Sequence, residues 1–283
     1  MKQNTEIRLI IFDMDGTLLD SNRRVSEDSI RAIQAASEQG MQFAFGTGRC
    51  ISELRIYPEV LQHIRYGSCE SGALLYDFFE EKMLQQIVFE PELLREVLEA
   101  SHREDLMVQF ESDGLGYAGR NEIPRMEHYQ YGKFRTLYEQ TAAAVPDIRQ
   151  ACLERIDHVE KINFFHADAE GRERTRKRLQ HLPLELIDGE ISALEISQKG
   201  ITKALGLQEL CRLLGLKPEE CAAVGDSDND LSMLQAAGLA IAMGNANDAA
   251  KAAADIVVAD NDHGGIREAI EICMQTRKAG MKD

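Results

Sequence analysis

Two short acidic segments hold the residue types best suited to chemistry. Asp13 and Asp15 lie in the run Asp-Met-Asp-Gly-Thr, and Asp226 and Asp230 lie in the run Gly-Asp-Ser-Asp-Asn-Asp. Either segment alone could be a polar turn or a helix cap, because Asp and Gly are common in both. Carboxylates brought together without basic neighbours repel one another, and a divalent cation relieves that repulsion. Hard oxygen ligands favour Mg²⁺ among the common ions, so the pair of segments predicts a magnesium site.

A hydroxyl group and cationic side chains complement the acidic segments. Residues 46–49 read Gly-Thr-Gly-Arg, so that Thr47 and backbone N–H groups would stand at the start of a helix. A helix N-terminus with free N–H groups suits a phosphate. Lys203 could bring a positive charge to the same place. Taken alone, however, Thr47 is equally a helix cap, Lys203 is a solvated helix lysine, and Lys199 is a competing candidate.

The elements that would hold these residues alternate between strand and helix patterns. Apolar runs at 8–12, 41–45 and 221–224 predict buried strands, and each ends at one of the polar segments. Residues 26–39 have helical spacing, and Gly40 would end that helix. Strands that alternate with helices predict βαβ units and a parallel sheet, whose ligands bind beyond the carboxyl ends of the strands.

The pattern changes between about residue 82 and residue 197. Apolar runs at 84–89, 106–110 and 161–165 predict strands, and 170–181 predicts a charged helix. The runs 184–187 and 191–196 are joined by Asp188-Gly189, which favours a hairpin. We therefore expect an α/β fold, a Rossmann-like doubly wound core with an inserted α+β cap domain. The division is core at 1–80, cap at 81–197 and core again at 198–283.

Composition narrows the classes of partner. The 283 residues carry 32 Lys and Arg against 48 Asp and Glu, a net charge of −16. An acidic chain is poorly suited to bind nucleic acid or an anionic membrane surface. No apolar stretch approaches the ~18 residues of a membrane span, and the N-terminus does not resemble a signal peptide. The six cysteines form no metal-binding spacing, so we expect buried reduced thiols in a cytoplasmic protein.

Taken in order, these motifs resemble those of a known family. Asp13-x-Asp15-Gly-Thr, Thr47, Lys203 and the segment from Gly225 to Asp230 are similar to the four motifs of the haloacid dehalogenase-like hydrolases. The insertion resembles the large α/β cap of the Cof-type phosphatase subgroup, and so do the runs at 46–49 and 243–246. Departures include Ser-Gly-Ala at 71–73, where the subgroup usually has Asn-Gly-Ala, and His263 near the C-terminus.

The resemblance implies a role for each matching residue. Asp13 would be the nucleophile that forms an aspartyl-phosphate, and Asp15 would be the general acid and base. Thr47 and Lys203 would hold phosphoryl oxygens. We expect further phosphate or substrate contacts from Gly16, Thr17, Gly48, Arg49 and Asn229.

The resemblance also implies a ligand set for Mg²⁺. The Asp13 carboxylate, the Asp15 backbone carbonyl and Asp226 would bind the ion, and Asp230 would orient Lys203 or a metal-bound water.

The expected activity is Mg²⁺-dependent hydrolysis of small soluble phosphomonoesters, such as sugar phosphates or phosphorylated cofactor precursors, by a monomer or small homo-oligomer. One alternative is a phosphomutase, which returns the group from the same aspartyl-phosphate to its substrate. Another is a non-catalytic protein of this fold that binds phosphorylated ligands. That alternative would usually lack the nucleophile, a metal ligand or the lysine, and all of these are present.

Overall fold

The computed structural model describes residues 6–189 and 192–280, with side-chain surroundings given as far as residue 276. The chain forms two compact units. The core unit consists of the residues up to Gly48, Tyr57–Leu84, and the residues from Thr202 on; the inserted unit consists of Arg49–Ile56 and Gln85–Ile201. The predicted division of the chain into domains at residues 80 and 197 stays a prediction. The short segment Arg49–Ile56 groups with the inserted unit, which sequence patterning did not anticipate.

The core unit is built on an eight-stranded sheet within the described residues. Its central strands are parallel, and only toward one edge does β4 run antiparallel to β3. All four residues of β1 are fully buried, as expected of a strand covered on both faces. In spatial order the strands are β14 (Ile256–Val257), β13 (Leu239–Ala242), β12 (Cys221–Gly225), β1 (Leu9–Phe12), β2 (Gln42–Gly46), β3 (Tyr66–Cys69), β4 (Leu74–Asp77) and β5 (Lys82–Gln86).

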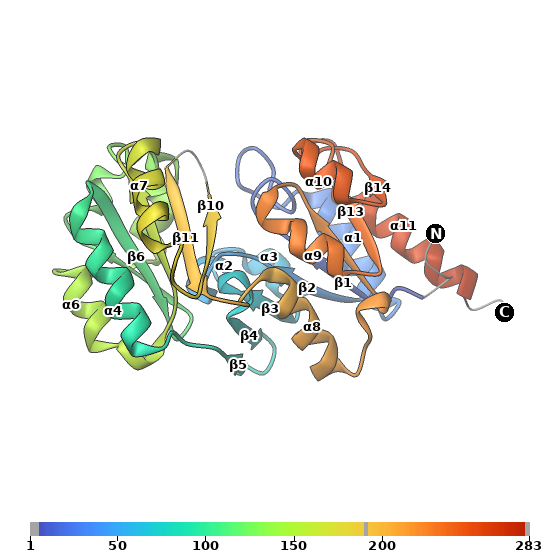
Figure 1. Ribbon diagram of the computed structural model, residues 1–283. Helices are drawn as coiled ribbons and strands as arrows, with labels where there is room; N and C mark the ends of the chain where they lie inside the picture. The colour runs from blue at the N-terminus through green and yellow to red at the C-terminus, as the bar shows by residue number, and fades with distance from the viewer. Residues whose placement is uncertain (1–5, 190–191, 281–283) are drawn as a thin grey trace. The chain divides into compact units, whose positions relative to one another are not determined.

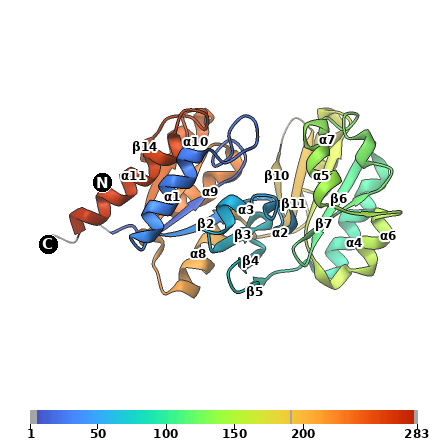
Figure 2. The same cartoon turned by 180° about the vertical axis from the view of Figure 1, so that it is seen from behind.

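Helices cover both faces of this sheet. Figures 1 and 2 show α1 (Glu27–Glu38) and α11 (Gly265–Gly280) on one face, and α8 (Lys203–Leu214) and α9 (Leu231–Ala236) on the other. Helix α1 begins at Ser26, whose hydroxyl accepts from the N–H of Ser29. Helix α8 begins after Thr202, which caps it, and ends at Gly215 in the left-handed conformation. The shorter helices of this unit are α3 (Pro58–Leu61) and α10 (Asp248–Ala253).

The inserted unit contains a six-stranded sheet within the described residues. Side chains alternate along its strands, so Val108 and Phe110 enter one apolar cluster while Met107 enters another on the opposite face. The strands are, in order, β10 (Leu184–Asp188), β11 (Ala193–Gln198), β9 (Val159–His166), β6 (Leu106–Ser112), β7 (Leu115–Gly119) and β8 (Ala143–Val145). The helices are α2 (Ile51–Leu54), α4 (Pro91–Ala100), α5 (Arg135–Thr141), α6 (Ile148–Glu154) and α7 (Ala169–Leu179).

Most predicted elements are confirmed, together with the α/β fold class. The strand expected at 84–89 is wrong in its bounds, because it covers Lys82–Gln86 and ends before Pro91 opens α4. The predicted hairpin is present as β10 and β11, which pair antiparallel from Leu184 to Asp188. Ile191, expected in its second strand, lies outside the described residues. All six cysteines are buried and outside any disulfide, as expected.

Candidate active site

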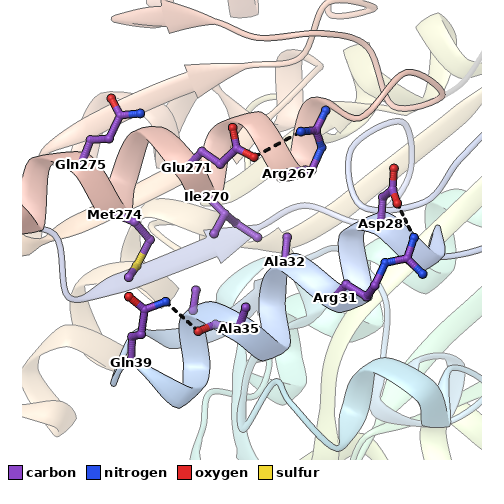
Figure 3. Close-up of a pocket in the computed structure, with 11 residues that line it drawn as sticks. Asp28, Arg31, Ala32, Ala35, Gln39, Arg267, Ile270, Glu271, Met274 and Gln275 are labelled. Carbon is purple, nitrogen blue, oxygen red and sulfur yellow. Dashed lines mark hydrogen bonds and ion pairs between the residues drawn. The ribbon is translucent and has the colours of Figure 1, made fainter.

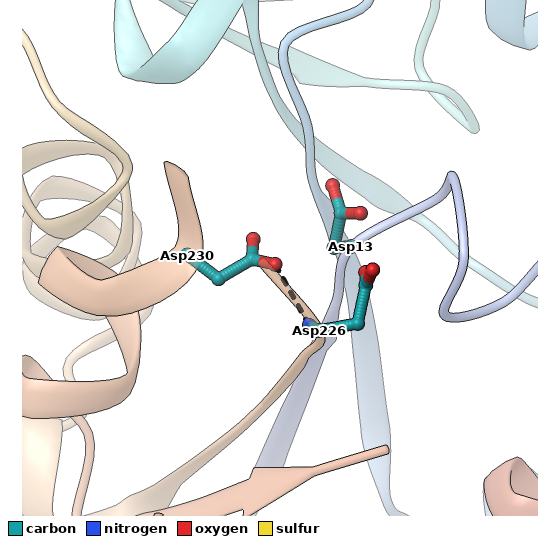
Figure 4. A group of neighbouring side chains, drawn as sticks. All are labelled: Asp13, Asp226 and Asp230. Carbon is teal, nitrogen blue, oxygen red and sulfur yellow. Dashed lines mark hydrogen bonds between the residues drawn. The ribbon is translucent and has the colours of Figure 1, made fainter. Parts of the chain in front are cut away.

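The acidic segments meet at the carboxyl ends of neighbouring strands. Asp13 follows β1 and Asp226 follows β12, and β1 pairs with β12 in parallel. Asp230 lies one turn beyond Asp226, at the end of the short 3₁₀ helix Asp228–Asp230. One carboxylate oxygen from each of Asp13, Asp226 and Asp230 lies within 4.8 Å of the other two, and Figure 4 shows the three side chains converging. We call these three residues the acidic cluster.

Lys203 joins the acidic cluster from the first turn of α8. Its Nζ donates to Oδ1 of Asp13 (2.6 Å) and to Oδ1 of Asp230 (2.7 Å), and the lysine is only 2% exposed. Burial alone lowers the pKa of this ammonium, but the charges of Asp13 and Asp230 outweigh burial and raise it. Lys203 therefore stays protonated. The competing candidate, Lys199, is exposed and belongs to the inserted unit, so the geometry favours Lys203.

Asp230 is held by more than the lysine. Its Oδ2 accepts from the backbone N–H groups of Asp226 (2.9 Å) and Ser227 (3.1 Å), while its Oδ1 faces Lys203. With both oxygens occupied, Asp230 is suited to orient its neighbours, and its role toward Lys203 or a metal-bound water stays a prediction. Asn229 is half-buried, and its Oδ1 accepts from the hydroxyl of Ser227 (2.8 Å).

The residues after β1 fix Asp226 from the other side. The hydroxyl of Thr17 donates to Oδ1 of Asp226 (2.9 Å), and Gly16 has a φ of +78°. A Cβ added at Gly16 would lie 2.5 Å from Oδ2 of Asp226, so only glycine leaves room for that carboxylate. Thr17 thus contacts a predicted metal ligand, and its predicted phosphate contact stays a prediction.

The electrostatics of the acidic cluster suit a divalent cation. Burial raises the pKa of Asp13 well above its ordinary value, and the charges of Asp230 and Asp226 add to this against the opposing effect of Lys203. Burial and Asp230 raise the pKa of Asp226 to about 6. Three carboxylates facing one ammonium leave two negative charges uncompensated when ionised, which a bound Mg²⁺ would neutralise. The donor set of carboxylate oxygens fits such an ion.

The remaining predicted site residues are Asp15, Thr47, Gly48 and Arg49. The structure constrains them to different degrees. Thr47 follows β2 and is 1% exposed; its backbone N–H donates to the carbonyl of Ser68 in β3, and its carbonyl accepts from the N–H of Ser71 in the loop after β3. Asp15 is half-buried, and its charge contributes to the raised pKa of Asp226. Gly48 is half-buried. Arg49 is buried and groups with the inserted unit, so its predicted substrate contact stays a prediction.

Two asparagines support the site but were not among the site residues predicted from the sequence. The side-chain amide of Asn245 donates to the carbonyl of Gly16 (2.8 Å), and the backbone N–H of Asn247 donates to the carbonyl of Asp226 (2.9 Å). Both lie in the turn between β13 and α10. The Met-Gly-Asn-Ala run at 243–246 is the signal that could have identified Asn245.

A groove of about 500 Å³ lies elsewhere in the core unit, between α1 and α11. Figure 3 shows Ala32 and Ala35 on α1 and Ile270 on α11 among the lining residues, with an ion pair between Arg267 and Glu271 on α11. None of the predicted site residues lines this groove.

Comparison with known proteins identifies the family. A family model described as haloacid dehalogenase-like hydrolase matches residues 10–270. The chain belongs to this family. Pyridoxal phosphate phosphatase YbhA of Escherichia coli is 30% identical over 93% of this chain and 97% of its own length. The 5-amino-6-(5-phospho-D-ribitylamino)uracil phosphatase YcsE of Bacillus subtilis is 26% identical over 95% of this chain and 96% of its own length.

Solved structures of haloacid dehalogenase-like hydrolases share the fold. One from Bacteroides thetaiotaomicron has a TM-score of 0.80 at 26% identity, covering 94% of this chain and 99% of that one. One from B. subtilis has a TM-score of 0.81 with the same identity and coverage. The comparisons confirm the predicted family, with its Cof-type features, and the prediction of a phosphoric monoester hydrolase.

Two other features of this haloacid dehalogenase-like hydrolase bear on its partners. No helix in the described part of the chain combines the length and apolar character needed to cross a membrane. The basic run on α7 is largely engaged within the inserted unit, where Arg174 and Arg178 pair with Glu104 and Arg176 pairs with Asp188.

Proposed function

We propose that this haloacid dehalogenase-like hydrolase is a Mg²⁺-dependent phosphatase that acts on small soluble phosphomonoesters through an aspartyl-phosphate on Asp13. The observation that supports it best is the ion pair of Lys203 with Asp13 beside Asp226. This arrangement offers a carboxylate nucleophile, a cation for phosphoryl oxygens and a cluster suited to a metal ion within one small volume.

In the first step, an Oδ atom of Asp13 attacks phosphorus and the bond from phosphorus to the leaving oxygen breaks. Asp15 gives its proton to that leaving oxygen. Lys203 and Thr47 hold the remaining phosphoryl oxygens in line. Asp230 keeps the ammonium in place because its own carboxylate is fixed by two backbone N–H groups.

In the second step, water attacks the phosphorus of the aspartyl-phosphate while Asp15 takes up a proton from it. The bond between phosphorus and Asp13 breaks, which frees inorganic phosphate and restores both carboxyl groups to their starting states. When bound by Asp13, Asp226 and the carbonyl of Asp15, Mg²⁺ supplies positive charge that offsets the repulsion between nucleophile and phosphate.

The printed names of the relatives support a substrate of metabolite size. One relative is named for pyridoxal phosphate and another for 5-amino-6-(5-phospho-D-ribitylamino)uracil, both small phosphorylated compounds. We therefore propose phosphorylated cofactors, cofactor precursors or sugar phosphates as the substrate class, and a cytoplasmic location to match them.

A phosphate-release assay tests this function. The wild type should release inorganic phosphate from an aryl phosphate and from members of a metabolite panel only when Mg²⁺ is present. Asp13→Asn should lower kcat by at least about 10³-fold, because the amide cannot form the intermediate. If Asp13→Asn retains Mg²⁺-dependent hydrolysis, the nucleophile is wrong. An isomeric sugar phosphate without phosphate release would indicate a phosphomutase, and tight binding without turnover would indicate a non-catalytic protein.

A further inference from the structure

The loop after β3 has an unusual backbone. Glu70, Ser71 and Gly72 have φ values of +56°, +58° and +101°, three consecutive residues in the left-handed region. Side-chain-bearing residues seldom adopt that region, and two in succession persist only where the surrounding structure fixes them. We call residues 68–72 the 68–72 turn. It is buried throughout, and its four residues from Ser68 to Ser71 are each at most 3% exposed.

The 68–72 turn holds Thr47 on both sides. The backbone N–H of Thr47 donates to the carbonyl of Ser68 (2.9 Å), and the backbone N–H of Ser71 donates to the carbonyl of Thr47 (2.9 Å). The left-handed conformation of Glu70 and Ser71 reverses the chain so that the N–H of Ser71 points back at Thr47. The backbone of Thr47 is therefore set by the turn as well as by its own strand.

The same turn also packs directly against the start of α8. A Cβ added at Gly72 would overlap the carbonyl oxygen of Thr202, the residue that caps α8 immediately before Lys203. On the facing side, a Cβ added at Gly206 would overlap the hydroxyl of Ser68 and lie 2.9 Å from Cα of Gly72. Glycine is unfavourable within a helix, so Gly206 is explained by this close approach.

We propose that the 68–72 turn is a positioning element that fixes Thr47 and Lys203 relative to each other at the phosphoryl site. The two side chains come from segments far apart in the sequence, and the turn contacts the backbone of one and the helix start of the other. This inference rests on the proposed function, because that function assigns phosphoryl oxygens to both side chains.

Substitution of the two glycines tests the proposal. Gly72 and Gly206 lie on opposite sides of one contact. Gly72→Ala and Gly206→Ala should each displace the first turn of α8 and with it Lys203. We expect kcat/KM for an aryl phosphate to fall by on the order of 10²-fold at saturating Mg²⁺, as for small displacements of a positioning group. The half-saturating Mg²⁺ concentration should rise less than in Gly16→Ala, because Gly72 and Gly206 contact the backbone around Lys203, whereas Gly16 contacts the carboxylate of Asp226.

A double-mutant cycle separates positioning from general damage. In a Lys203→Met background, Gly72→Ala and Gly206→Ala should change the residual activity by less than about twofold, since both substitutions act on the first turn of α8 and the group that this turn carries is gone. A full loss that persists in the Lys203→Met background would overturn the proposal. So would an unchanged kcat/KM in a folded Gly72→Ala protein. If one alanine variant fails to fold, the other glycine variant decides, because both test the same contact.

The other end of α8 provides a matched control. Gly215 is also left-handed, with a φ of +67°, but a Cβ there would meet nothing within 4 Å. Gly215→Ala imposes a similar backbone penalty on the same helix away from the turn, and its kcat/KM should stay within about threefold of wild type. An activity loss equal to that of Gly72→Ala would point to helix strain and overturn the proposal.

Failure of the proposed function would be visible separately. If the wild type hydrolyses no phosphomonoester, the phosphatase proposal fails. Calorimetric binding of inorganic phosphate in the presence of Mg²⁺ then tests the positioning role of the 68–72 turn. Gly72→Ala should weaken phosphate binding by about tenfold or more, and Mg²⁺ binding alone should change less than phosphate binding does. Equal phosphate affinity in both proteins would overturn the turn's role.

Discussion

Lys203 donates to Asp13 across 2.6 Å in a site where both side chains are almost fully buried. The same ammonium reaches Asp230, so one cation holds two carboxylates that would otherwise face each other. Removing one partner of a buried ion pair is costly because it leaves an uncompensated charge. The lysine is therefore a structural requirement of the site as well as a candidate ligand of the phosphoryl group.

The first prediction concerns this lysine. Lys203→Met should lower the free energy of unfolding by about 3–5 kcal/mol without Mg²⁺ and abolish most of the hydrolysis. Because Mg²⁺ would replace part of the missing positive charge, it should raise the melting temperature of Lys203→Met more than that of wild type. Thermal melts with and without Mg²⁺ measure both effects.

Lys199 supplies the control for this experiment. It is exposed in the inserted unit, so Lys199→Met should leave stability within about 0.5 kcal/mol and the Mg²⁺ response unchanged. An equal Mg²⁺ shift in the Lys203→Met and wild-type proteins would contradict the assigned electrostatics.

The second prediction concerns the space beside Asp226. Gly16→Ala places a Cβ 2.5 Å from Oδ2 of Asp226 and strains a backbone with a φ of +78°. The carboxylate must then move, so the half-saturating Mg²⁺ concentration should rise by about tenfold or more, as for changes that disturb a metal ligand's support. A Mg²⁺ titration of phosphate release measures this. Gly264→Ala is the control, because Gly264 is also left-handed but its Cβ would meet only Arg267 at 3.6 Å.

The sequence predicted the acidic cluster well because strand ends in a parallel sheet converge. Asp13 and Asp226 each follow a short apolar run, and no long-range information was needed to expect them at one edge. The choice between Lys203 and Lys199 depended on where α8 begins, which Thr202 decides by capping it. The family motifs had already favoured Lys203, and the ion pair with Asp13 explains why.

Other features depend on contacts between distant segments and left little local signal. The approach of Gly72 to Gly206 is invisible in either segment alone, since isolated glycines have many explanations. Likewise, Glu53 on α2 lies close enough to Glu111 and Lys161 on the sheet of the inserted unit to affect their pKa values. Nothing in the local pattern of α2 indicates that these residues would meet.

The third prediction concerns Glu111, which is 2% exposed on β6. Burial raises its pKa to about 8 against the opposing charge of Lys161, and the charge of Glu53 adds to the rise. A carboxyl group with a raised folded pKa contributes its full stability below its unfolded pKa, near 4.5, and loses it as pH rises toward 8. Glu111→Gln removes this loss and should be more stable than wild type at pH 8 by up to about 4 kcal/mol.

Urea unfolding between pH 5 and pH 9 measures the effect of Glu111→Gln. The advantage of the variant should shrink steadily toward pH 5, where wild-type Glu111 is protonated in the folded state. Glu96→Gln is the control. Because Glu96 is exposed on α4, this variant should have the same free energy of unfolding as the wild type at each pH. Parallel curves for the wild type and Glu111→Gln would show that this carboxyl group does not titrate as expected.

The fourth prediction concerns Glu104, whose side chain is 5% exposed and faces Arg174 (2.7 Å) and Arg178 (2.5 Å) of α7. Arg174 lowers the pKa of Glu104 through its hydrogen bonds, and Arg178 adds to this against the effect of burial. Glu104→Gln should cost about 1–2 kcal/mol near pH 7, a modest value because both arginines are partly solvent-screened. A lowered folded pKa means that the stability contributed by Glu104 is present above pH 4.5 and is lost as pH falls further. The stability deficit of Glu104→Gln should therefore disappear in acid.

Glu170→Gln is the matched control, since Glu170 is 92% exposed and reaches the same Arg174 only at 4.0 Å. Equal stability losses for the two variants in urea unfolding at pH 7 would show that burial of Glu104 adds nothing to the pair.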